Sequence, residues 1–148
     1  MNYLGIDYGR KKVGVSICLG KVGIILPMDA IISENDGGKI DKILRIVEQN
    51  AIDGIAIGYP LNMDGTAGDM AKEVDKFVEK LASKLPSGVQ IARMDERLTS
   101  EQAIGTSKLF HGRQSASRKK KERRRGSLDS QAAMIILQDF LAELELRS

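Results

Sequence analysis

The chain has 148 residues, of which 42% are hydrophobic and 29% are charged, and its formal net charge at pH 7 is +3. These proportions are ordinary for a folded protein, and the length favours a single domain. No apolar run approaches the roughly 18 residues that cross a bilayer. The N-terminus leads directly into a strand-like segment and lacks the pattern of a secretory signal. We therefore expect one cytoplasmic domain over residues 1–148, with no membrane partner.

The charge is distributed unevenly along the chain. Between Arg113 and Arg125 the local charge is +7, which leaves −4 for all other residues. A basic segment on an acidic body indicates a polyanionic partner, although such a segment can also be only a solvated face. It holds no aromatic residue, so phosphate contacts are expected in place of base stacking. The candidate nucleic-acid contacts on this flexible loop, at about 112–126, are Arg118, Lys119, Lys120, Lys121, Arg123, Arg124 and Arg125.

The first third of the chain predicts three strands. Residues 4–6 and 13–17 are strand-like and separated by a Gly-containing turn, which is typical of a β-hairpin. A third strand follows over residues 22–32, interrupted at Pro27, which has no amide proton and favours an edge or a bulge. The only cysteine, Cys18, excludes an intramolecular disulfide and is expected to be a buried strand residue. Residues 33–38 have the composition of a loop.

The remaining elements alternate between helix and strand. Apolar residues at helical spacing predict a first helix over residues 40–50 and a second from Thr66, where Asp69 has capping-box spacing, to Pro86. Further elements are strands at 52–57 and 89–93, a helix from Thr99 to Phe110, and a last helix from Ser127 to about Leu146. The fold class is thus α/β, with a five-stranded mixed sheet of three antiparallel strands followed by two parallel ones, and helices on both faces.

Acidic side chains are expected to gather at one edge of this sheet. Asp7 ends the first strand, and Asp95 and Glu96 follow the fifth, where alternation allows only one of the two to face Asp7. Asp129 lies on the apolar stripe of the last helix and so faces the protein. Each has a plainer interpretation: Asp7 as a turn former and Asp129 as a first-turn acid.

Three carboxylates brought together would repel one another unless cations lay between them. Mg²⁺ or Mn²⁺ prefers such oxygen ligands and keeps positions open for water and phosphate. A site of this kind hydrolyses phosphodiesters by two-metal chemistry. The sequence therefore predicts a metal-dependent hydrolase acting on nucleic acid.

Four separated motifs resemble the YqgF/RuvX family over nearly the whole chain. They are Gly5 to Gly9 with Lys11 to Gly14, Gly58 to Gly65, Asp95 to Thr99, and Asp129 with Ala132, Ala133 and Ile136 to Gln138. The resemblance implies a ribonuclease H-like fold and a nuclease that is either a Holliday-junction resolvase or an enzyme maturing the 5′ end of pre-16S rRNA. By motif position it assigns catalysis and metal binding to Asp7, Glu96 and Asp129, and it selects Glu96 over Asp95.

Other residues have more than one possible role. Lys11 is a candidate nucleic-acid contact, Asn62 either binds a strand or stabilises its own turn, and His111 is either a surface residue or an accessory general base. Symmetric junction cleavage needs two related sites, and the sequence shows no dimerisation device. We therefore favour rRNA processing by a monomer or homodimer. The rivals are a non-catalytic nucleic-acid-binding factor and an actin-like ATP-binding protein, which normally needs two such domains.

Overall fold

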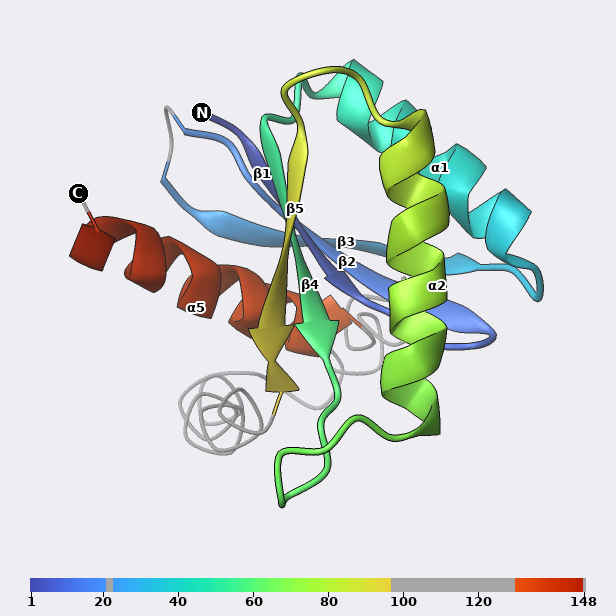
Figure 1. Ribbon diagram of the computed structural model, residues 1–148. Helices are drawn as coiled ribbons and strands as arrows, with labels where there is room; N and C mark the ends of the chain where they lie inside the picture. The colour runs from blue at the N-terminus through green and yellow to red at the C-terminus, as the bar shows by residue number, and fades with distance from the viewer. Residues whose placement is uncertain (21–22, 97–129, 148) are drawn as a thin grey trace, which may run out of the picture.

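The computed structural model describes residues 1–20, 23–96 and 130–147. Strands and helices alternate after an initial run of strands, as Figure 1 shows. The described elements are β1 (Tyr3–Asp7), β2 (Lys12–Cys18), β3 (Ile25–Ile32), α1 (Asp36–Gln49), β4 (Gly54–Tyr59), α2 (Asp69–Lys84), β5 (Gln90–Asp95) and α5 (Gln131–Arg147). None of the described helices is long and apolar enough to cross a membrane.

The strands form a five-stranded sheet in the order β3-β2-β1-β4-β5. β2 is antiparallel to both β1 and β3, whereas β4 is parallel to both β1 and β5. This confirms the predicted mixed sheet of three antiparallel and two parallel strands. Since β1, β4 and β5 run in the same direction, their carboxyl ends lie at one edge of the sheet. Asp7, Tyr59 and Asp95 are the last residues of these three strands.

Helices cover both faces of the sheet: α1 and α2 lie on one face and α5 on the other (Figure 1). The larger part of the core packs α1 and α2 against the sheet through residues such as Ile43 and Phe77. A smaller cluster under α5 includes Ile136 and Leu137. Cys18, in β2, belongs to this second cluster and is buried, as predicted.

The N-terminal part of α5 is held closely against the sheet. The Ser130 hydroxyl donates to the Met28 carbonyl oxygen at 2.7 Å and accepts from the Val15 amide at 3.0 Å. One turn later, Ser16 Oγ donates to the Ala133 carbonyl oxygen at 2.8 Å. Gly5 permits this approach, because a Cβ there would lie only 2.5 Å from the same carbonyl oxygen. Side-chain hydrogen bonds therefore fix the start of α5 on β2 and β3.

Two predicted helix starts were wrong. The loop predicted over residues 33–38 ends earlier, because the Asn35 side chain accepts from the Gly38 amide at 2.7 Å and caps a helix that begins at Asp36. The second helix begins at Asp69 with Gly68 as its N-cap, not at Thr66. Thr66 Oγ1 accepts from Asn62 Nδ2 at 3.0 Å and donates to Asp64 Oδ1 at 2.6 Å, so its hydroxyl group serves the loop before the helix.

The other predicted boundaries agree to within a few residues. Pro27 lies in β3, which is an edge of the described sheet, as its missing amide proton predicted. α2 ends at Lys84, just before the proline expected to stop it. The helix predicted from Thr99 to Phe110, the basic loop at about 112–126 and the predicted Ser127 cap lie outside the described residues.

Candidate active site

Asp7 and Glu96 meet at the carboxyl edge of the sheet. Asp7 is the last residue of β1, and Glu96 directly follows β5, two strands away. Their carboxyl groups share a hydrogen bond, in which protonated Glu96 is the donor and Asp7 the acceptor. Two of the three predicted catalytic acids, which are remote in the sequence, are thus in direct contact.

The environment of this pair favours retention of a proton. Burial raises the pKa of Asp7 above its usual value. Burial, the negative charge of Asp7, the hydrogen bond between the two groups and the charge of Asp95 together raise the pKa of Glu96 to about 7. Below about pH 7 Glu96 therefore keeps its proton in the folded protein when no cation is bound.

Gly58, near the end of β4, makes room for the Glu96 carboxyl group. A Cβ at this position would overlap Glu96 Oε1 and would lie 2.7 Å from Ile136 Cδ1. Gly58 thus shapes the site by having no side chain, a role that our sequence analysis did not identify. The available signal was a glycine near the end of an otherwise apolar strand, which often marks close approach of another group.

The loop after β4 is stabilised by its own hydrogen bonds. The Asn62 backbone amide donates to the Thr66 carbonyl oxygen at 2.9 Å, and the Gly65 amide donates to the Asn62 carbonyl oxygen at 2.8 Å. Asn62 Nδ2 donates to Thr66 Oγ1 at 3.0 Å. Of the two roles considered for Asn62, the structure shows the turn-stabilising one. A contact of Asn62 with nucleic acid stays a prediction.

The other predicted site residues occupy different positions. Lys11 is exposed in the turn between β1 and β2. Asp95 ends β5, with its Cα paired to Tyr59 of β4. Asp129, His111 and the basic residues Arg118, Lys119, Lys120, Lys121, Arg123, Arg124 and Arg125 lie outside the described residues. Asp129 directly precedes Ser130, which is fixed on the sheet by the two hydrogen bonds described above.

The donor set of this pair suits a hard divalent cation. Within residues 1–20, 23–96 and 130–147, no group of three or more His, Cys, Asp or Glu side chains could hold a metal. The described pair, Asp7 and Glu96, offers carboxylate oxygens, the ligands that Mg²⁺ and Mn²⁺ prefer. A cation would also replace the proton that the two groups now share. The residues present therefore fit such an ion.

The chain is similar to known proteins over almost its entire length. The model of one protein family, described as RuvX: Holliday junction resolvase, matches residues 1–143. A protein of Opitutus terrae named "Putative pre-16S rRNA nuclease" is 36% identical over 141 residues, which cover 95% of this chain and 91% of that protein. A protein of Pseudomonas savastanoi pv. phaseolicola with the same name is 35% identical over 140 residues, covering 95% and 90%.

Solved structures with the same architecture include junction-resolving enzymes. RuvC of T. thermophilus in complex with a Holliday junction substrate has a TM-score of 0.60 at 15% identity, and the match covers 97% of this chain and 96% of that one. Fowlpox virus resolvase with substrate Holliday junction DNA has a TM-score of 0.58 at 12% identity, covering 97% and 99%. At such low identity the likeness concerns the fold, and it confirms the expected ribonuclease H-like architecture.

Proposed function

Because the chain belongs to the RuvX family, we propose that it is a metal-dependent nuclease that hydrolyses phosphodiester bonds in structured nucleic acid. The observation that carries the proposal is the direct contact of Asp7 and Glu96 at the carboxyl edge of the sheet. Buried carboxyls that share a proton are costly to ionise unless a cation compensates them. The pair therefore has little structural purpose and suits cation binding.

Asp7, Glu96 and Asp129 are the proposed catalytic and metal-binding residues. When bound, Mg²⁺ or Mn²⁺ supplies Lewis acidity that lowers the pKa of water and stabilises a leaving oxygen. Glu96 would lose its proton to solvent when a cation binds, and Asp7 on the central strand would fix the position of the pair. Gly58 leaves the space that the Glu96 carboxyl needs. Ser130 anchors the chain beside Asp129.

We favour processing of the 5′ end of pre-16S rRNA as the role of this activity. Two relatives of similar length that carry this name share about a third of their residues with the chain. We propose that residues 1–148 form a single domain. Its basic segment at about 112–126 would bind the phosphates of the RNA, and Lys11 and Asn62 would contact the RNA nearer the site. Holliday-junction resolution is the second candidate, because the description of the matching family names it.

The test incubates the purified protein with a precursor 16S rRNA fragment and, separately, with a synthetic four-way DNA junction, each with and without Mn²⁺. We expect Mn²⁺-dependent cleavage of the RNA, and loss of cleavage in Asp7→Asn and Glu96→Gln. Glu79→Gln, which changes an exposed carboxylate on α2, is the matched control and should cleave normally.

Each outcome selects one function. Cleavage of the junction alone would assign the second candidate. Metal-independent binding without cleavage of either substrate would refute the nuclease and leave a binding factor. Full activity in Asp7→Asn would refute the assigned site.

A further inference from the structure

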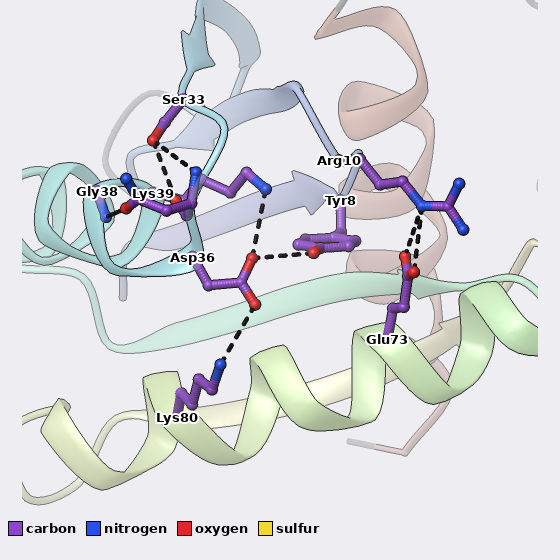
Figure 2. A network of polar contacts seen from close by, with 9 residues as sticks. Tyr8, Arg10, Ser33, Asp36, Gly38, Lys39, Glu73 and Lys80 are labelled. Atoms are coloured by element: carbon purple, nitrogen blue, oxygen red, sulfur yellow. Dashed lines mark hydrogen bonds and ion pairs between the residues drawn. The ribbon is translucent and has the colours of Figure 1, made fainter.

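A second polar site lies on the opposite face of the sheet from α5. It is a cavity of about 330 Å³ where the β1–β2 turn, the start of α1 and the side of α2 meet. Its lining includes Tyr8, Arg10, Asp36, Lys39, Lys76 and Lys80. Figure 2 shows how most of these side chains converge. The nuclease site described above uses none of them.

Asp36 is the centre of this network. Its Oδ1 accepts from the Tyr8 hydroxyl at 3.0 Å and from Lys39 Nζ at 3.3 Å, and its Oδ2 lies 3.7 Å from Lys80 Nζ (Figure 2). Lys39 is only 1% exposed, and its ammonium group lies 4.9 Å from the centre of the Tyr8 ring. One carboxylate thus faces two ammonium groups, one of them buried. The fold therefore fixes the position of Lys39, whereas the Lys80 side chain is largely exposed.

Arg10 adds a third cationic group to the lining of the cavity. Its Nε lies 3.0 Å from Glu73 Oε2, whereas its terminal nitrogens point away from Glu73 (Figure 2). Among the described residues, the lining holds four cationic side chains and three acidic ones. This positive excess is notable because the chain outside the basic segment carries a net charge of −4. The net charge of the lining is thus +1, and its cationic side chains offer contacts to an anion.

We propose that this cavity binds a backbone phosphate of the nucleic acid that is cut at Asp7 and Glu96, an inference that rests on the proposed nuclease function. Asp7 is the last residue of β1, and Tyr8 directly follows it. The Asp7 carboxyl contacts Glu96, which like Ile136 of α5 lies close to Gly58, whereas the Tyr8 ring packs on Phe77 of α2 on the other face of the sheet. A nucleic-acid strand that passes over the β1–β2 turn would therefore reach both the acidic pair and the cavity. Lysine and arginine contacts to phosphate fix the position of a substrate without reading its sequence.

The cavity is poorly suited to a nucleobase. The Tyr8 ring already contacts the Lys39 ammonium group and packs on Phe77, with ring centres 4.7 Å apart. Its hydroxyl group is held by Asp36. The lining offers four cationic side chains, which are the groups that donate charge-assisted hydrogen bonds to a phosphate. The predicted contact is thus electrostatic and independent of sequence.

The test compares two double variants on the same helix. Lys76→Gln with Lys80→Gln removes two lining charges, and Lys72→Gln with Lys84→Gln removes two exposed charges of α2 that do not line the cavity. Binding of a fluorescent precursor-rRNA fragment is measured by anisotropy without divalent metal, over a range of salt concentrations. We expect the lining variant to bind about three- to tenfold more weakly, with a salt slope smaller by about one to two. The control should change by less than about twofold.

A third variant should change RNA affinity in the opposite direction. Glu73→Gln removes an acidic group from the lining, so we expect tighter RNA binding and a steeper salt dependence. Equal weakening of both double variants, or no change in the lining variant, would overturn the proposal. Thermal melting of each variant shows whether the protein still folds.

A phosphate probe separates this proposal from the nuclease proposal. Inorganic phosphate should shift the NMR signals of Tyr8 and Asp36 in the wild type but not in the lining variant. Metal-dependent cleavage with unchanged RNA affinity of the lining variant would reject the cavity and keep the nuclease. Phosphate binding in a protein that neither binds nor cleaves nucleic acid would reject both assignments and leave a site for a free anion.

Discussion

Replacement of Glu96 by glutamine should stabilise the protein above neutral pH while abolishing cleavage. In the folded protein the pKa of Glu96 is raised from 4.5 to about 7, mainly by burial and by the charge of Asp7. The folded state therefore binds more protons than the unfolded state between these two pH values. By linkage, this carboxyl group makes the wild type less stable as the pH rises through that window.

The size of the effect follows from the displacement of the pKa. Moving the pKa of Glu96 from 4.5 to about 7 corresponds to about 3 kcal/mol. Because Glu96 is only partly buried, solvent screening reduces this to about 2 kcal/mol. A glutamine amide loses this penalty and can still donate a hydrogen bond to Asp7. We therefore expect Glu96→Gln to be about 2 kcal/mol more stable than the wild type at pH 8, and to show little gain at pH 4.5.

Urea unfolding in the presence of EDTA, at several pH values from 4.5 to 8, measures this difference. Mn²⁺ should then stabilise the wild type at pH 8 by binding to the folded state, and it should stabilise Glu96→Gln much less. Glu79→Gln serves as the control and should follow the wild type throughout. Parallel stability curves for the wild type and Glu96→Gln would refute the shared proton and, with it, the electrostatic description of the site.

Three further predictions concern the surroundings of the site. Gly58→Ala should displace the Glu96 carboxyl and lower stability by about 1–3 kcal/mol, with weaker Mn²⁺ binding in calorimetry. Ser130→Ala leaves the Val15 amide and the Met28 carbonyl without their partner, so we expect a loss of about 1–3 kcal/mol in urea unfolding and reduced cleavage. Replacement of Arg123, Arg124 and Arg125 by glutamine should weaken RNA binding and flatten its salt dependence.

For each of these three predictions, one result would contradict the reasoning. Unchanged Mn²⁺ affinity in Gly58→Ala would show that Glu96 does not bind the ion. Ser130→Thr keeps the hydroxyl group, so cleavage equally impaired in both serine variants would remove the anchoring role. An unchanged salt slope in the triple arginine variant would assign the basic segment to a solvated surface.

The sequence predicts the sheet well because each strand has a local signal. The first two strands are predicted by alternation in the hairpin. The edge position of the third follows from the missing amide proton of Pro27, and the fourth is predicted by the apolar run before Gly58. Asp7 could be identified in the same way, since it ends the first strand. The choice between Asp95 and Glu96 came from the family motif, and the structure places Glu96 against Asp7.

The features that escaped prediction depend on contacts between distant segments. The need for a glycine at position 58 in β4 becomes visible only once Glu96, which follows β5, is seen to lie against it. The helix start assigned to Thr66 was wrong because Thr66 Oγ1 accepts a hydrogen bond from Asn62 Nδ2 in the preceding loop, a local competition that capping-box spacing does not reveal. The cavity around Asp36 likewise joins three segments, and no motif in the sequence indicates it.

β1, which ends at Asp7, and β5, which precedes Glu96, differ in the number of neighbouring strands that hold them in the sheet. β1 is hydrogen-bonded along both sides, to β2 and β4, whereas β5 pairs with β4 alone among the described strands. Amide exchange should accordingly be slowest around Asp7 and faster next to Glu96, because outer strands open at a lower free energy than inner ones. Separation of this outer strand would part the carboxyls and release a bound ion while the rest of the domain stays folded.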